Sequence, residues 1–294
     1  MSKHQSPIEK QLEALPPLPL TVTKVIEVTA NPESSANDLV KAILPDQTMC
    51  VTILKFANSV LYGRPKKVSS LETAVMVLGF NEIQGIVMGK AAVASFNKLF
   101  EEHRSMLDQF WTHAFNCGLA ARIVSENMSL KSGQFFMAGL LHDIGKLAMA
   151  LSFKDKYMDE DWLLSFSTSK IQAREKELFS ISHDEIGARL LERWKFPNNL
   201  VSALRYHHAP GEAESMPGYP LVIQVADFLS HMLNLKETPD ERRLKSALHH
   251  YLPEFESRWQ QENLPWEDIT LESWFAWLKV DAEHGSEILD VLAT

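Results

Sequence analysis

The chain has 294 residues, enough for one large domain or two smaller ones with a sizeable core. Hydrophobic residues make up 45% of it and charged residues 23%, the proportions of an ordinary globular protein. The formal net charge of -9 argues against nucleic-acid binding through a broad basic face. A local basic pocket for one phosphate is still compatible with that charge.

The sequence offers no targeting or membrane signal. Residues 1–10 are polar and lack the apolar core of a signal peptide. The most apolar window, 83–96, contains two glycines, a glutamine and a lysine and is too short to span a bilayer. Cys50 and Cys117 show neither metal-ligand nor redox spacing, which favours a reducing compartment. We therefore expect a cytoplasmic protein without membrane association.

Turn residues and apolar spacing divide the first hundred residues into short helices. Residues 1–12 are an expected frayed lead-in, and the proline-rich stretch 15–19 is a stiff entry that cannot be helical. Ser34 or Ser35, Asp46 and Ser70 are the N-cap candidates. Apolar periodicity predicts helices over about 20–31, 34–44, 46–57, 70–79 and 81–97.

The same periodicity continues through the rest of the chain. It predicts helices over about 106–127, 183–196, 198–208 and 221–235, with mostly loop and a short helix over 157–168. Residues 133–151 hold an apolar run with a His-Asp pair. Ser182 to Glu185 has the pattern of a capping box, which places His183 in the first turn of a helix. Thr238-Pro239 is a predicted linker, and two or three further helices follow it. Because no alternating strand of useful length occurs, the predicted class is all-α.

One stretch carries chemistry of its own. An apolar run leads into Leu140-Leu141-His142-Asp143-Ile144-Gly145-Lys146, so an imidazole and a carboxylate come at the end of a buried segment. Two such groups are costly to bury unless they are paired or bind a metal. Imidazole with carboxylate suits Zn, Fe, Ni or Mn better than Ca or Mg. On a continuous helix Lys146 would face the same side as His142.

Further histidines and carboxylates recur at helix ends and on inner helix faces. In chain order the candidates form the series His, His-Asp, His, His-His, Asp: His113, His142, Asp143, His183, His207, His208 and Asp227. This order resembles that of the HD superfamily of metal-dependent phosphohydrolases. The His-Asp-x-Gly-Lys form and the later His-His pair resemble its two-metal branch, which includes the HD-GYP phosphodiesterases.

The N-terminal half resembles a particular relative of that superfamily, the HDOD domain. The likeness rests on four motifs: Leu15-Pro16-Pro17-Leu18-Pro19, Ala57 to Gly63, Ala74 to Gly79, and His183 to Gly187 followed by Trp194-Lys195-Phe196-Pro197. It covers roughly residues 13–232. HDOD domains are bacterial signalling modules that have commonly lost metal ligands and act through regulatory interactions. Here the ligand set looks complete, which departs from that pattern.

The resemblance implies an HD-like bundle with extra C-terminal helices, and it sets the expected domains. These are a lead-in over 1–12, an HDOD domain over 13–235 with halves at 13–100 and 101–235, and an extension over 236–294. Asn58-Ser59 and Tyr62-Gly63 are expected to be turn residues without a catalytic role. Gly218-Tyr219-Pro220 lacks the surroundings of a full HD-GYP motif and is expected to be coincidental.

Carried over residue by residue, the resemblance implies two divalent transition metals, Fe or Mn first and Zn or Ni as alternatives. His113, His142, Asp143 and Asp227 would hold the first metal. Asp143 would bridge to a second, completed by His183, His207 and His208. Asp143 and Lys146 would be catalytic, with the Lys146 ammonium neutralising a phosphate oxygen.

Plainer interpretations stand beside these. His142 could be a helix-end histidine bonded to a neighbouring carboxylate. His113 could be bonded to a backbone carbonyl, His183 could be exposed, and the His207-His208 pair could be a polar helix end like His249-His250. Asp227 could belong to a solvated face with Ser230, His231 and Asn234, and Lys146 could be a surface charge. The four late tryptophans are better explained by packing than by a ligand cage: Trp259, Trp266, Trp274 and Trp277.

Three functions remain open at this point. The first is a metal-dependent hydrolase for a phosphorylated small molecule or nucleotide. The second is a regulatory module that binds signalling proteins, with or without metal. The third keeps the metals as a structural staple only. In none of them do we expect nucleic acid or membrane as a partner.

Overall fold

The computed structural model describes residues 13, 18–59, 62, 67–128, 130, 134–153, 155–158, 169–235, 238–264 and 271–293. Within these ranges every regular element is a helix, so the all-α prediction is confirmed. The predicted lead-in over 1–12, most of the proline-rich entry, residues 60, 61 and 63 of the second motif, and most of the 157–168 loop lie outside the described residues.

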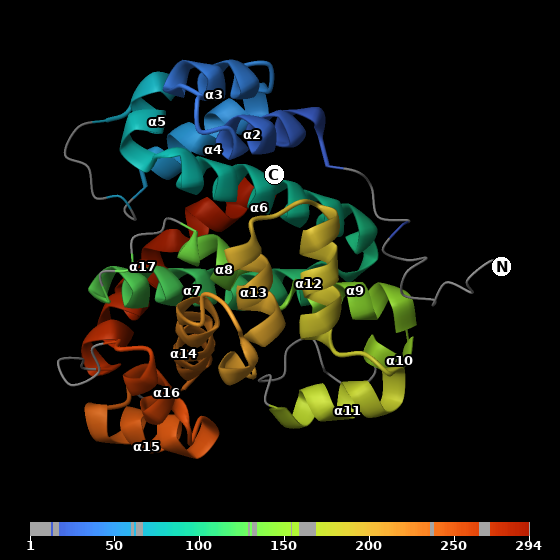
Figure 1. Ribbon diagram of the computed structural model, residues 1–294, viewed down its shortest axis with the longest axis vertical. Helices are drawn as coiled ribbons and strands as arrows, with labels where there is room; N and C mark the ends of the chain where they lie inside the picture. The colour runs from blue at the N-terminus through green and yellow to red at the C-terminus, as the bar shows by residue number, and fades with distance from the viewer. Residues whose placement is uncertain are drawn as a thin grey trace.

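Four short helices form a layer on one side of a long fifth helix, α6 (Figure 1). Their bounds are α2 (Leu20–Ala30), α3 (Ala36–Ile43), α4 (Gln47–Ala57) and α5 (Leu71–Leu78), and α6 covers Phe80–Leu99. The predicted N-caps Ser35, Asp46 and Ser70 each accept a hydrogen bond from the first turn of their helix. The side-chain amide of Asn58 is bonded to the Val68 carbonyl and amide at 2.7 Å, which confirms the structural role expected of that turn.

The middle of the molecule is built around α7 (Arg104–Asn127), which follows the short η2 (Glu101–His103). It packs against α8 (Phe135–Leu141), α14 (Gly218–Met232) and α17 (Leu271–Ala293). A methyl group on Gly139 would lie 2.6 Å from the Cys117 carbonyl oxygen, so α8 approaches the backbone of α7 directly. This close approach brings the end of α8 next to the middle of α7.

A second group of helices follows the His142-Asp143 pair in the chain. It comprises α9 (Ile144–Phe153), α10 (Asp155–Met158), α11 (Ser169–Phe179), α12 (His183–Arg193), α13 (Asn198–Tyr206) and η3 (Pro210–Glu212). A Cβ on Gly145 would meet the His183 carbonyl oxygen at 1.8 Å and the Gly187 nitrogen at 2.8 Å. Only a glycine therefore lets α9 lie directly on the first turn of α12.

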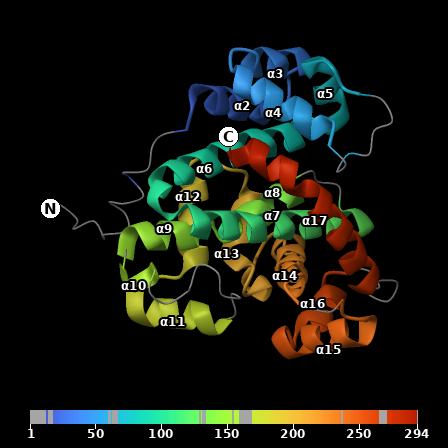
Figure 2. The ribbon, with the colours of Figure 1, turned by 180° about the vertical axis from the view of Figure 1, so that it is seen from behind.

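The C-terminal segment packs back onto the rest of the chain. The described residues after 238 form α15 (Glu241–Tyr251), α16 (Phe255–Gln261) and α17. In Figure 2, α17 runs beside α7 toward α6, and the Lys90 ammonium in α6 donates to the Val291 carbonyl at 2.8 Å. Trp259 and Trp274 are buried and Trp277 is half exposed, which fits the packing role expected of the tryptophans; Trp266 lies outside the described residues.

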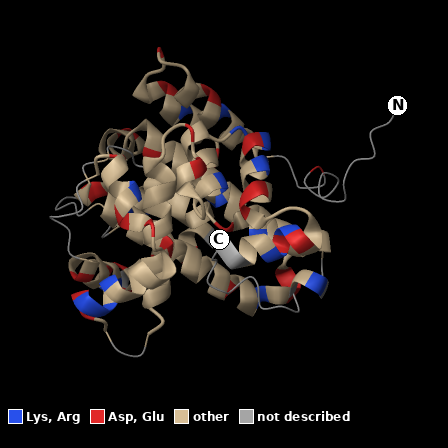
Figure 3. Cartoon of the chain, turned by 60° about the horizontal axis from the view of Figure 1, so that its bottom comes forward, with Lys and Arg blue, Asp and Glu red and all other residues tan. Residues whose placement is uncertain are grey.

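The outer surface carries mixed charge. In the view of Figure 3, positions occupied by Lys or Arg and positions occupied by Asp or Glu are interspersed along the helices. One stretch, Phe135–Phe153, is long and apolar enough to cross a membrane, but 89% of it is buried inside the fold. It contains the break between α8 and α9 with His142 and Asp143, as expected of a core segment of a folded domain.

Candidate metal centre

His142 and Asp143 occupy the break between α8, which ends at Leu141, and α9, which begins at Ile144. The stretch is therefore not the continuous helix on which Lys146 would face the same side as His142. His142 is fully buried and Asp143 is 1% exposed. The Nδ1 of His142 lies 2.7 Å from the Gly139 carbonyl oxygen, so Nδ1 donates a hydrogen bond to that oxygen and Nε2 is the ring nitrogen turned toward the cluster. The break turns both side chains toward the interior.

His183 is the first residue of α12, as predicted, but the predicted capping box does not form. Ser182 makes no capping hydrogen bond; instead the buried Glu175 of α11 accepts the His183 backbone N–H at 2.8 Å. The same Glu175 oxygen lies 2.7 Å from His183 Nδ1, and the Tyr157 hydroxyl donates to the other oxygen at 2.7 Å. His183 is fully buried, so the exposed alternative is wrong.

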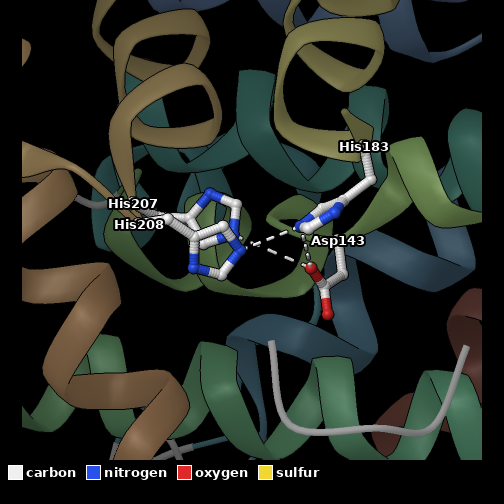
Figure 4. A group of neighbouring side chains, drawn as sticks. All are labelled: Asp143, His183, His207 and His208. Carbon is white, nitrogen blue, oxygen red and sulfur yellow. Dashed lines mark hydrogen bonds and ion pairs between the residues drawn. The ribbon is translucent and has the colours of Figure 1, made fainter. Parts of the chain in front are cut away.

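His207 and His208 follow the last residue of α13, and Figure 4 shows them facing His183 and Asp143. His207 Nδ1 lies 2.7 Å from the Leu204 carbonyl oxygen, which again leaves Nε2 pointing inward. His208 Nε2 lies 2.9 Å from His183 Nε2. The pair is therefore part of the cluster and not a plain polar helix end.

His113 in α7 and Asp227 in α14 complete the set from the other side. His113 Nε2 lies 3.1 Å from Asp227 Oδ1, and the Ser230 hydroxyl oxygen lies 3.2 Å from His113 Nδ1. Asp227 is 4% exposed, so it does not belong to a solvated face. His231, one turn further along α14, also places its Nε2 3.3 Å from Asp227 Oδ1.

The seven predicted residues meet as two adjoining groups. The inner group is Asp143, His183, His207 and His208, and the outer group is His113, His142 and Asp227; within each, the potential ligand atoms lie within 4.8 Å of one another. Asp143 Oδ1 lies 3.3 Å from His183 Nε2 and 3.7 Å from His207 Nε2. Asp143 Oδ2 lies 3.3 Å from His142 Nε2, so this carboxylate touches both groups.

Lys146 joins the cluster through Asp143. Its ammonium lies 2.7 Å from Asp143 Oδ2, and the side chain is 1% exposed. The surface-charge alternative for Lys146 is therefore wrong. The lysine compensates part of the carboxylate charge that the interior would otherwise disfavour.

Opposing effects set the protonation of these groups. Burial raises the pKa of Asp143, but the positive charges of His142 and Lys146 outweigh burial and hold the pKa well below its usual range. Burial likewise raises the pKa of Asp227, and His231, His113 and His142 bring it well below the ordinary value. Both carboxylates are therefore ionised at neutral pH and available as ligands.

The pKa values of the imidazoles shift in different directions, depending on the groups around them. Burial lowers the pKa of His183, but the Glu175 and Asp143 carboxylates raise it to about 9. In His142 burial is likewise outweighed by Asp143, and the pKa lies well above the usual value. Burial depresses the pKa of His113, and burial with His207 and His183 depresses that of His208 well below normal. A cation that binds Nε2 must displace the protons held by His142 and His183.

The donor set fits a divalent transition metal. Among the described residues, the Nε2 atoms of His113, His142 and His207 are buried and make no hydrogen bond, although each faces a carboxylate oxygen. Buried polar atoms normally have a hydrogen-bond partner or bind an ion. Imidazole nitrogens and carboxylate oxygens in this mixture suit Mn, Fe, Zn or Ni. The cluster therefore supports binding of a divalent metal.

Two residues of the site escaped sequence reasoning. Glu175 lies eight positions before His183 in a stretch for which no helix was predicted, and its only signal is a carboxylate on the apolar side of α11. His231 was noticed only as part of a polar face, although its position four residues after Asp227 places it on the same side of a helix. Gly218-Tyr219-Pro220 forms the start of α14. The ring centroids of Tyr219 and Phe135 are 4.3 Å apart and the rings are stacked, so Tyr219 has a packing role.

The fold is all-helical, and histidines and aspartates from distant helices meet in one cluster that could hold metal ions. The protein is therefore a helical domain with a candidate metal site. A sequence profile of the HDOD domain matches residues 15–210, and the chain belongs to the HDOD family. An uncharacterized protein of Treponema pallidum is 24% identical over 254 residues, 84% of this chain and 48% of that protein. Ribonuclease Y of Thermus thermophilus is 28% identical over 145 residues, 49% of this chain and 19% of that enzyme. The chain thus spans half or less of these curated relatives.

Solved structures agree on the fold. An HDOD domain protein from Geobacter sulfurreducens has a TM-score of 0.65 at 21% identity, covering 97% of this chain and 96% of that one. A protein from Shewanella amazonensis named "Putative phosphohydrolase" has a TM-score of 0.67 at 19% identity and covers 99% of both chains. A second Shewanella amazonensis protein, named "Putative metal-dependent phosphohydrolase", has a TM-score of 0.58 at 23% identity over 93% of this chain and 95% of that one.

Proposed function

We propose that this chain is an HDOD-type signalling protein whose cluster holds two divalent transition metals and hydrolyses a phosphate monoester or diester. The observation that carries the proposal is the orientation of the ligands. His113, His142, His183 and His207 each have Nδ1 beside a fixed oxygen, and each points Nε2 at Asp143 or Asp227. Such anchoring of the outer nitrogen is typical of metal-binding histidines.

Each ligand group and Lys146 has a separate role in this proposal. The inner group would hold one ion and the outer group the other, with Asp143 between them. Two ions bound there would supply Lewis-acid stabilisation of the charge that develops on the phosphoryl oxygens. Lys146 keeps the Asp143 carboxylate ionised and fixed through the 2.7 Å contact to Oδ2. Its ammonium is close enough to the cluster to attract a phosphate oxygen as well.

The test combines metal analysis with turnover. Protein loaded with Mn²⁺ or Fe²⁺ should carry two equivalents of metal and hydrolyse p-nitrophenyl phosphate or bis(p-nitrophenyl) phosphate above background. A short single-stranded RNA belongs in the same screen as a phosphodiester, although the net charge of -9 disfavours it. Asp143→Asn should abolish metal binding and turnover, whereas Glu283→Gln, at an exposed position of α17, should change neither. Full metal loading without turnover of any ester would refute hydrolysis.

A regulatory interaction module is the second candidate, favoured by the surface of the N-terminal layer. Leu20, Leu44, Val51 and Met76 are between 51% and 74% exposed, and large apolar side chains in such number fit contact with a signalling protein. This function requires no turnover even with both metals bound. If the metals act only as a staple, chelation should lower the melting temperature with no activity to lose. For either function we take the cytoplasm as the compartment, because Cys50 and Cys117 are free thiols.

A further inference from the structure

A cleft of about 430 Å³ lies on the surface between α7 and the end of α14. His113 and His231 are among the residues that line it, so the cleft opens onto the outer group of the cluster. The side chains of His113 and His231 are 16% and 14% exposed, whereas those of His142 and His183 are fully buried. On this side the candidate metal centre reaches the surface through the cleft.

The lining of the cleft is polar and almost uncharged. Gln109, Thr112 and Asn116 follow one another at helical spacing on α7, and Asn234 faces them from the end of α14. Amides and hydroxyls of this kind form hydrogen bonds with hydroxyl groups and give little affinity for an apolar group. A hydroxylated group is therefore the chemistry that this lining recognises.

The charges at the cleft limit the number of phosphates. Asp108 contributes a carboxylate, and none of the described residues that line the cleft is Lys or Arg. A second phosphate placed here would meet a carboxylate and no compensating cation, which costs free energy. A single phosphate placed at the buried cluster would instead lie near Lys146 and the metal ligands.

The volume suits a small group. About 430 Å³ lies toward the lower end of the range for small-molecule pockets, so one sugar-sized group fits and a long polymer does not. His231 stands where the cleft meets the cluster, with its Nε2 3.3 Å from Asp227 Oδ1. Together with His113 it lines the cleft next to Asp227, so a hydroxylated group bound there would lie beside the outer group of ligands.

We propose that this cleft binds the sugar-like part of a phosphate monoester and selects against a second phosphate. The proposal rests on the proposed function for the fate of the ester, but the binding it describes can be measured without turnover. Three probes test this. Ribose 5-phosphate has one phosphate and a hydroxylated group, ribose 1,5-bisphosphate has a second phosphate, and phenyl phosphate has an apolar group in place of the sugar.

The test measures equilibrium binding by calorimetry and initial rates on Mn²⁺-loaded protein. Wild type should prefer ribose 5-phosphate over each of the other two probes by at least about tenfold, in Kd or in kcat/KM. Asn116→Leu removes one cleft amide at nearly constant size and should reduce the preference over phenyl phosphate at least about fivefold. Asp108→Asn should narrow the discrimination against the bisphosphate. Asn127→Leu, on the same helix outside the cleft, is the matched control and should leave both preferences unchanged.

The outcomes separate this proposal from the function it rests on. If ribose 5-phosphate binds with the expected preference but no ester is hydrolysed, hydrolysis is refuted and the cleft assignment stands. If esters are hydrolysed but Asn116→Leu and Asp108→Asn leave the preferences at wild-type values, the cleft assignment is overturned and hydrolysis stands. Absence of ribose 5-phosphate binding to the wild type also overturns the cleft assignment.

Discussion

The two ligand groups differ in how the chain holds them. Three of the four inner-group residues are buried and His208 is half-buried, and Glu175 and Lys146 support His183 and Asp143 through charged contacts. The outer group adjoins the cleft, and the Nδ1 of His113 faces the neutral Ser230 hydroxyl. Buried, charge-supported ligands should bind a metal tightly and exchange it slowly. Ligands beside a cleft leave room for a substrate, so we expect the inner group to retain metal and the outer group to meet the phosphate.

The largest effect is expected at the residue that touches both groups. Asp143→Asn removes the negative charge that faces His142, His183 and His207. We expect both metals to be lost, with affinities falling more than about 100-fold. Metal content measured after dialysis tests this. Retention of one full equivalent would show that Asp143 serves a single group.

Breaking one group at a time tests whether the two are independent. His208→Ala should remove one equivalent of metal from the inner group, and His113→Ala should remove one from the outer group. Because Glu175 and Lys146 support two inner-group ligands through charged contacts, the metal left in His113→Ala should dissociate more slowly than the metal left in His208→Ala. Chelator-induced release kinetics measure the difference. Loss of both metals from either variant would mean a single coupled centre.

Glu175→Gln sharpens the comparison without changing a ligand. The amide keeps the size of the side chain but removes the charge that holds His183 Nδ1. We expect inner-group affinity to fall about tenfold and the outer group to be unchanged. Glu177→Gln, exposed on the same helix, is the control.

The same variant has a pH signature in the metal-free protein. The His183 pKa is raised from 6.5 to about 9, so its charged contacts stabilise the fold fully below pH 6.5, and this stability is lost as the pH rises to 9. Glu175→Gln should flatten that loss, as measured by urea unfolding at pH 6 and pH 9. An unchanged slope would contradict a role for Glu175 through His183.

The buried carboxylate of Glu82 provides a contrast to those of Asp143 and Asp227. Burial raises the pKa of Glu82 to about 7, although the Tyr62 hydroxyl donates to it and Arg122 lies near. Its folded pKa lies above the unfolded value of 4.5, so stability is full below pH 4.5 and falls as the pH rises through 7. Glu82→Gln should therefore increase the free energy of unfolding over that of the wild type more at pH 8 than at pH 5. The increase should differ between the two pH values by on the order of 1–3 kcal/mol. Denaturant unfolding measures it; the exposed Glu101→Gln should show no such difference.

Sequence reasoning reached the fold class and the ligands because both depend on strong local patterns. Apolar periodicity and the caps Ser35, Asp46 and Ser70 specify helices directly. The order of His and Asp along the chain resembles that of a known family, and this resemblance predicted the candidate ligands. The assignment of metal to these seven residues stays a prediction, although the structure brings them together.

The remaining features depend on contacts between distant segments. The first turn of α12 is capped by Glu175 of another helix, so Ser182 to Glu185 was misread as a local capping box. Burial of Lys146 follows from the break before α9, which periodicity in an apolar stretch does not reveal. The contact of His231 with Asp227 was within reach of helical spacing, but a polar face is usually solvated.

The backbone contact at Gly145 has a consequence for the evolution of such sites. Because a single methyl group there would lie 1.8 Å from the His183 carbonyl oxygen, replacement by alanine would push α9 away from α12 and separate Asp143 from His183. One conservative-looking codon change could thus silence the centre while leaving all seven candidate ligands intact. When homologous chains are sorted into metal-competent and metal-free members, the residue at this position should be inspected together with the ligands.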